Sequence, residues 1–237
     1  MFAAKPAQRE LWLSERMRIL DLGCGAGEDL TSWGVTASDE VTGLDIDGRV
    51  LALAKLRFPK RTYLRGMGEC LPFAAASFDR VVSNVALPYM NIPQALAEIY
   101  RILVAGGSLS LSLHHPSFTF AELLDNALPK PLPTLFRLYV AANGLFFHCT
   151  GRTVGFVNSR TESFQTERGM RLALERAGFV GPSFKTLPGP AGIRFHVEAK
   201  KPVTRPFVAS PSAASRSRSE AAGEHWKIPA ARGSGLS

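Results

Sequence analysis

The sequence predicts an α/β domain in which a seven-stranded, mostly parallel sheet lies between two layers of helices. From about residue 18 to residue 113, five short apolar runs alternate with turn-rich or helix-compatible segments. Such alternation is typical of parallel sheets. Two further apolar runs, residues 180–187 and 193–199, flank a segment with two prolines and two glycines, which predicts an antiparallel hairpin at the sheet edge.

The first unit, residues 18–30, organises the rest of the chain. Residues 18–22 are short and apolar enough for a buried strand, and the alternating glycines Gly23, Gly25 and Gly27 follow before a polar, helix-compatible stretch. This order of strand, tight turn and helix is typical of nucleotide-binding turns, because glycine lets the backbone bend sharply and approach a ligand.

The charge at this turn indicates which nucleotide it binds. A dinucleotide site would place a pyrophosphate at the following helix start, but Glu28 and Asp29 stand there and would repel it. They suit S-adenosylmethionine (SAM), which carries an ammonium and a sulfonium. The pattern Asp21-x-Gly-x-Gly-x-Gly resembles motif I of the Rossmann-like, class I SAM-dependent methyltransferases.

A second acid extends the cofactor prediction. Asp45 ends the next apolar run, residues 41–45, about as far beyond the glycine turn as the ribose-binding acid in nucleotide-binding βαβ units, where the spacing is about 20 residues. Asp47 is better suited to cap the helix predicted over residues 49–57.

The resemblance becomes specific between residues 66 and 84 and points to the small-molecule branch, the ubiquinone and menaquinone biosynthesis type. There the family has Gly-Asp-Ala-Glu-x-Leu-Pro-Phe before Ser-Phe-Asp, and this chain matches Gly66, Glu69, Leu71, Pro72, Phe73, Ser77, Phe78 and Asp79. Met67 replaces the family's adenine-binding aspartate, which predicts weaker SAM binding. Residues 98–107 match Glu-x-x-Arg-x-Leu-x-Pro-Gly-Gly except for Ala105.

The resemblance covers about residues 18–113 and implies a Rossmann-like αβα sandwich with SAM at the carboxyl ends of the strands. It implies cofactor contacts at Asp21, Gly23, Cys24, Gly25, Gly27, Asp45, Ile46, Met67, Gly68, Glu69 and Asn84. Further along, the apolar spacing predicts a helix over residues 92–103, and the strict alternation of residues 108–113 predicts a strand with one less buried face.

The segment 114–165 breaks the pattern, with eight Phe or Tyr residues and four prolines. One interpretation is a lid that lines a substrate pocket, with residues 134–147 as its helix; the other is extra core packing or a dimer surface. The predicted substrate contacts are Pro88, Tyr89, Tyr139 and Phe147.

The ends of the chain are assigned separately. Residues 5–16 predict a short amphipathic helix over the sheet edge or the cofactor cleft. A last helix begins after Thr166 and ends at Gly178. The methyltransferase domain is expected to span residues 1–202, and residues 203–237, rich in Pro, Ser, Ala and Arg, to be a disordered tail.

Composition limits the partners. No apolar run is long enough for a membrane span or a secretory signal, so a cytoplasmic location is expected. Cys24, Cys70 and Cys149 lack metal spacing, which indicates reduced thiols and no metal site. Of the net charge of +8, the tail contributes +3, from five basic against two acidic residues, and the other basic residues are dispersed. No nucleic-acid partner is therefore expected, and the protein is expected to be a monomer or homodimer.

The predicted chemistry is methyl transfer from SAM to a small, partly apolar metabolite. His114 and His115 follow the fifth strand at the cleft end and are the candidate general bases, since a histidine pKa lies near neutrality; a purely structural role is the alternative. An RNA or protein methyltransferase, or a non-catalytic SAM- or NAD-binding regulatory module, remain alternative functions.

Overall fold

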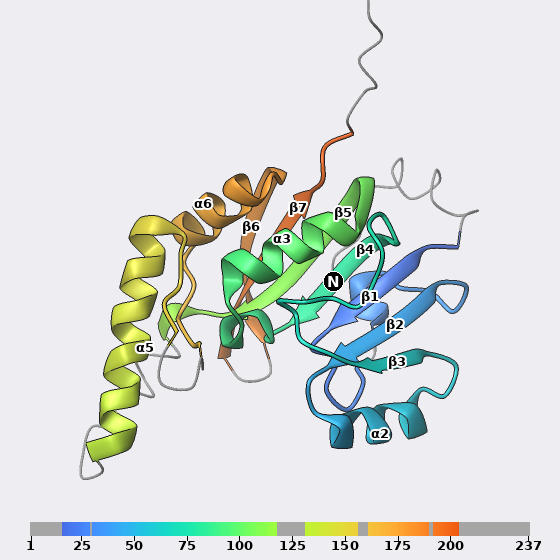
Figure 1. The fold of residues 1–237 in the computed structure, drawn as a ribbon, viewed down its shortest axis with the longest axis horizontal. Coiled ribbons are helices and arrows are strands. Elements are labelled where there is room, and N and C mark those ends of the chain that lie inside the picture. Colours follow the sequence, from blue (N-terminus) through green and yellow to red (C-terminus); the bar gives the residue numbers. More distant parts are fainter. Residues whose placement is uncertain (1–15, 29, 118–130, 156–160, 190–191, 204–237) are drawn as a thin grey trace, which may run out of the picture. The chain divides into compact units, whose positions relative to one another are not determined.

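The computed structural model describes residues 16–28, 30–117, 131–155, 161–189 and 192–203. They form a seven-stranded sheet with the order β3-β2-β1-β4-β5-β7-β6 (Figure 1). The strands are β1 (Arg18–Leu22), β2 (Glu40–Asp45), β3 (Thr62–Arg65), β4 (Phe78–Asn84), β5 (Leu103–His114), β6 (Val180–Gly189) and β7 (Gly192–Lys200).

The pairing confirms the predicted fold class. Strands β1 to β5 pair in parallel, while β7 is antiparallel to both β5 and β6. The predicted hairpin therefore forms one edge of the sheet, with β6 outermost. Strands β2 and β3 lie on one side of β1, and β4 and β5 lie on the other. The strand order therefore reverses at β1, and ligands of such sheets bind at this point.

The helices are α2 (Gly48–Arg57), α3 (Ile92–Ile102), α5 (Pro131–Thr150) and α6 (Glu167–Ala177), with short 3-10 turns η2 (Thr31–Trp33) and η3 (Leu87–Tyr89). Their ends follow the expected capping chemistry. Asp47 accepts from the backbone N–H of Arg49 at the start of α2, and Thr166 accepts from Gly169 at the start of α6. Gly178, with φ +96°, ends α6.

Helices lie on both faces of the sheet. On one face, α3 and α6 pack on alternate residues of the strands, including Leu20, Leu109 and Val197, and form the main hydrophobic core. On the other face, α2 lies over β2 and β3, where the Tyr63 hydroxyl donates to the carbonyl of Phe58 at the helix end. The predicted three-layer sandwich is therefore present.

The helix expected directly after the glycine turn is not formed. In the part of this connection that the structure describes, η2 is the only helical element, and Gly34 ends it with φ +77°. The backbone N–H and the hydroxyl of Thr36 then donate to the Asp39 carboxylate. Leu30 and Val35 are buried in a small second hydrophobic core together with Ile19, Val41 and Val82. Gly34, in the left-handed conformation, ends the helical backbone, and β2 begins at Glu40.

The expectation of a less buried face on the alternating strand is also wrong. Ser110 and Ser112 of β5 are buried, because the Arg80 guanidinium crosses this face, donating to Ser110 Oγ and to the carbonyl of Trp33.

Several predictions lie outside the described residues: the helix over residues 5–16, Asp29, parts of the segment 114–165, and the tail from residue 204 onward. Among the described helices, none has the length and apolar character needed to cross a bilayer.

Candidate active site

The glycine turn after β1 has the backbone geometry that its sequence predicts. Gly23, Gly25 and Gly27 all have positive φ, at +72°, +52° and +82°. A Cβ on Gly23 would lie 2.1 Å from the Cβ of Ala86, whereas a Cβ on Gly25 would project into open space. The turn therefore needs glycine for close packing at one position and leaves room for a ligand at the next.

Asp45 lies at the carboxyl end of β2, against this turn. Its Oδ2 accepts from the backbone N–H of Gly25 at 2.9 Å, and its Oδ1 accepts from that of Asp47 at 2.9 Å. Each carboxylate oxygen has two acceptor positions, so both can still accept from a ribose hydroxyl. The turn and the acid thus form one preassembled unit.

Three carboxylates, Asp21, Glu28 and Asp45, act on one another at this end of the sheet. Asp21 is only 4% exposed, and its pKa is raised to about 7, first by burial and then by the negative charges of Glu28 and Asp45, against the opposing charge of Arg61. The same burial and the charges of Asp21 and Asp45 raise the pKa of the Cys24 thiol to about 12. The site is therefore suited to a cation, and Cys24 stays protonated.

Two arginines that the sequence analysis did not identify bind backbone carbonyls of the glycine turn. Arg57, at the end of α2, donates to the carbonyls of Ala26 and Gly27, and Arg61 donates to the carbonyl of Glu28. Arg61 also stacks on the Phe58 ring, 4.1 Å from its centroid. Neither arginine belongs to a motif, and only the packed helix brings them to the turn.

Asn84, at the carboxyl end of β4, connects the glycine turn to the far strands. Its Nδ2 donates to both oxygens of Glu28, at 2.7 and 2.9 Å, and its Oδ1 accepts from Arg194 at 3.3 Å. Arg194 lies opposite His114 in the register of β7 and β5. Burial, and then the charge of Arg194, lower the pKa of His114, so its imidazole is neutral near pH 7.

The two predicted bases differ in their surroundings. His114 ends β5 opposite Arg194, which donates to Asn84. His115 Nδ1 lies 2.8 Å from the Ser117 hydroxyl in the following turn. A neutral imidazole can accept a proton near pH 7, and His114 ends the strand next to β4, so it is the first of the two candidate bases.

The Gly66–Phe73 segment is fixed to α3. Glu69 accepts from the backbone N–H of Asn91 at the helix start, and Glu98 accepts from that of Leu71. Arg101 pairs with Glu98 at 2.8 Å and donates to the carbonyls of Leu71 and Phe73. The Glu-x-x-Arg pattern therefore has a physical role, which is to hold this loop. In this structure Glu69 connects the loop to the start of α3.

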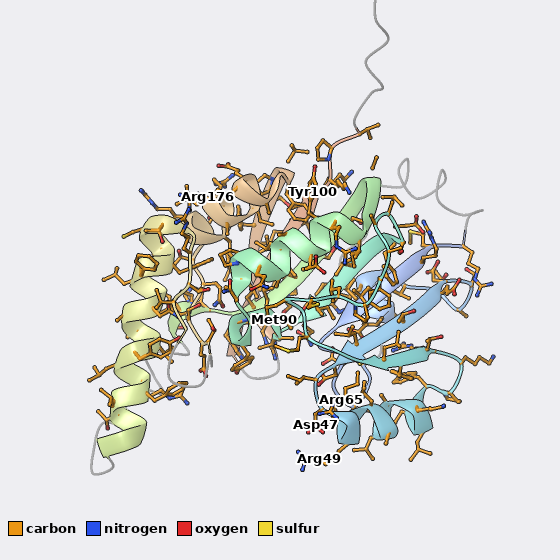
Figure 2. The ribbon with its side chains drawn as sticks, in the orientation of Figure 1. Asp47, Arg49, Arg65, Met90, Tyr100 and Arg176 are labelled. Carbon is orange, nitrogen blue, oxygen red and sulfur yellow. The ribbon has the colours of Figure 1, made fainter. Side chains whose placement is uncertain are left out.

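Two apolar side chains border the end of the sheet beside Asp45. Ile46 is 59% exposed and Met67 is 52% exposed, and the backbone hydrogen bond from Gly66 to the carbonyl of Asp45 holds the two segments together. Gly68 packs against Met90, whose Sδ would be 2.5 Å from an added Cβ. Figure 2 shows Met90 near the start of α3. Ile46 and Met67 are suitable walls for a flat, partly apolar base.

A hollow of about 480 Å³ adjoins this region and is lined by Ile46, Asp47, Gly48, Arg49 and Arg65. Asp47, Arg49 and Arg65 come together at the start of α2 (Figure 2). Two guanidiniums border this hollow, so the cationic end of SAM is better matched by the acids at the glycine turn.

The predicted substrate contacts are dispersed. Pro88 is buried in η3, and Tyr89 beside it is exposed. On α5, the Tyr139 hydroxyl donates to the carbonyl of Val154 at 2.6 Å, while Phe147 is 0% exposed and packs against Gly169 in the main core. The location of Phe147 does not support a substrate contact.

The residues present fit SAM. The open space at Gly25, the ribose-type acid Asp45, the apolar pair Ile46 and Met67, and the acids Asp21 and Glu28 match a neutral base and sugar with a cationic end. Among the described residues, no group of His, Cys, Asp or Glu side chains has a geometry that could hold a metal ion.

Comparison with known proteins agrees with this geometry. A family model described as a methyltransferase domain matches residues 20–111. An uncharacterized methyltransferase of Synechocystis sp. is 37% identical over 111 residues, 45% of this chain and 52% of that protein. The demethylmenaquinone methyltransferase of Chlorobaculum tepidum is 31% identical over 181 residues, 75% of this chain and 71% of that protein.

The fold has solved counterparts as well. A SAM-dependent methyltransferase of Methanosarcina mazei has a TM-score of 0.55 at 21% identity, covering 85% of this chain and 100% of that one. Of the first curated relatives, the chain spans only about half the length or less. The similarity to the Chlorobaculum protein extends over most of both chains, however, and this chain therefore belongs to the class I SAM-dependent methyltransferases.

Proposed function

We propose that this protein transfers a methyl group from SAM to a small, partly apolar metabolite. The observation that carries the proposal is the meeting of Asp21, Glu28 and Asp45 at a glycine turn with no side chain at Gly25. Such a site repels a pyrophosphate and attracts a sulfonium and an ammonium.

Each of these residues has a proposed task. Asp45 accepts hydrogen bonds from the ribose hydroxyls, Ile46 and Met67 enclose the adenine, and Asp21 and Glu28 face the cationic end. When bound, SAM supplies a methyl group on a sulfonium, already activated for in-line transfer. The chain then has to align the acceptor and exclude water, and positioning alone contributes several kcal/mol, up to about 7–11 kcal/mol in the most favourable cases.

We further propose that His114 removes the proton from the acceptor. Its imidazole is neutral because burial and Arg194 lower its pKa, and it ends the strand next to β4, whose end carries Asn84. His115 remains the second candidate base, and Pro88, Tyr89 and Tyr139 remain candidates for the pocket wall.

The acceptor class is proposed from two observations. The Chlorobaculum relative is named a demethylmenaquinone methyltransferase, and the turn η3, of sequence Leu-Pro-Tyr, follows the Asn84 end of β4 here. The three cysteines are free thiols, which supports the proposal that the protein works in a reducing compartment, the cytoplasm. The dispersed basic residues support a small molecule, rather than a nucleic acid, as the substrate.

Calorimetric titration with SAM and, separately, with NAD tests the cofactor site. We expect SAM to bind and NAD not to bind. Asp45→Asn removes a charged acceptor and should weaken SAM binding roughly 10- to 150-fold, the equivalent of about 1.5–3 kcal/mol. Glu40→Gln, at the opposite end of the same strand, is the matched control and should bind as the unmodified protein does. Binding of NAD without SAM would overturn the proposal.

Turnover is tested separately. We expect S-adenosylhomocysteine to form when a hydroxylated naphthoquinol with a short side chain is supplied together with SAM. If SAM binds with normal affinity but no acceptor of small size is methylated, the non-catalytic binding module becomes the better description.

A further inference from the structure

Helix α5 is apolar on the face that looks away from the protein. Its inner face packs on α6 and the core through Val140, Gly144 and Phe147. On the opposite side lie Leu135, Leu138, Ala142, Leu145 and Cys149, all exposed. Successive members of this outer stripe are 3, 4, 3 and 4 residues apart, which is the spacing of a helix–helix seam.

The exposure of the outer stripe is substantial. Leu135 is 56% exposed, Leu138 53% and Leu145 61%, and the adjoining Phe146 is 41% exposed. A helix that is apolar all round is normally buried on every side. In Figure 1, α5 lies beside α6 on the β6 side of the sheet, whereas α2 and β3 lie at the opposite side. The stripe is therefore remote from the glycine turn and needs a partner of its own.

We infer that the outer stripe of α5 binds the same stripe of a second copy of this chain, forming a twofold symmetric dimer. Ala142 lies at the middle of the stripe, with two members on either side, so the surface is suited to pack against itself about a twofold axis through Ala142. A small residue at the crossing point lets the two helices approach closely, and the leucines on both sides fill the grooves.

The size and charge of the stripe agree with this occupant. The three leucines and Phe146 are each about half exposed, and a large apolar side chain has a surface of roughly 200 Å². Burying the exposed half of these four side chains in both copies therefore covers roughly 800 Å². With Ala142 and Cys149, the total approaches the ~1,000 Å² expected of a specific interface. Arg137, beside the stripe, is paired with Glu162 at 3.3 Å, so its charge is compensated within its own copy.

Sedimentation velocity of the full chain over a hundredfold concentration range tests the inference. We expect a dimer that Leu138→Glu combined with Leu145→Glu converts to monomer, because four carboxylates would be brought into the seam. The matched control is Leu53→Glu with Leu56→Glu, which changes two exposed leucines of α2 and should leave the dimer intact. A monomeric unmodified protein, or a dimer that the stripe variant preserves, would overturn the inference.

A cross-linking measurement tests the position of the axis. In a background with Cys70→Ser and Cys149→Ser, Ala142→Cys should form an intermolecular disulfide under mild oxidation, since a residue on the axis meets its own copy within the roughly 7 Å that a disulfide needs between Cα atoms. Leu53→Cys in the same background should not cross-link. Equal cross-linking of both variants, or none at residue 142, would contradict the proposed axis, whatever the outcome of the SAM and methyl-transfer measurements.

Discussion

The raised pKa of Asp21 predicts that SAM binding converts this carboxyl to its ionised form and so releases a proton. In the free protein this pKa is about 7, against an ordinary value of 3.8. Ionising Asp21 therefore costs about 4 kcal/mol more free energy in the folded protein than in the unfolded chain. Between about pH 4 and pH 7 the folded state holds a proton that the unfolded state has lost, so the free energy of unfolding should fall as the pH rises through this window and level off above it.

The cationic ligand favours the ionised form. Nearly all Asp21 is protonated at pH 5.5 and about a quarter at pH 7.5, so SAM binding should release about one proton at the lower pH and about a quarter of one at the higher. Titration calorimetry in buffers of different ionisation enthalpy measures these numbers directly. SAM affinity should rise with pH up to about 7.

Asp21→Asn separates this group from the others. The variant should unfold at higher denaturant concentration than the unmodified protein at pH 8, should bind SAM more weakly, and should lose the pH-dependent proton release. Glu40→Gln should retain it, and the titration of the ligand itself is common to both variants. Equal proton release at both pH values in the unmodified protein, or an unchanged release in Asp21→Asn, would refute the reasoning.

Three further predictions concern the base and the loop. His114→Ala should lower kcat by about 10²- to 10⁴-fold with SAM affinity unchanged, and in the unmodified enzyme kcat should fall only as the pH drops through the lowered His114 pKa; full turnover in this variant and in His115→Ala would show that alignment suffices. Met67→Asp should tighten SAM binding in calorimetry by adding an acceptor for the adenine amine, and no gain or a loss would contradict the placement of this loop. Arg101→Ala should destabilise the protein by about 1.5–3 kcal/mol in denaturant unfolding, against at most about 0.5 kcal/mol for Arg16→Ala, whose surface pair with Glu40 is the control; equal losses would mean that the loop is held otherwise.

The features that the sequence predicted well are local ones. The glycine turn, its acid and Asp45 lie within 25 residues, and each needs only its neighbours to adopt its geometry. Pairs such as Asp47 with α2 and Thr166 with α6 are likewise set by hydrogen bonds within one turn.

The features that escaped prediction depend on contacts distant in sequence. Arg57 and Arg61 reach the glycine turn from about 30 residues away, and Arg194 reaches Asn84 across 110 residues. The polar stretch after the turn was compatible with a helix by composition, but Gly34 and the burial of Val35 in the second core favour an irregular connection. The Glu98 and Arg101 pattern was visible in the sequence, whereas the loop carbonyls that it binds were not.

The hydrogen bonds from Arg57 and Arg61 to the glycine turn have a thermodynamic consequence. Because these bonds fix the backbone of the turn before SAM binds, little conformational entropy remains to be lost on complex formation. Association is then expected to proceed without a slow rearrangement of this segment, and the end of α2 contributes to cofactor binding through the glycine turn that it holds.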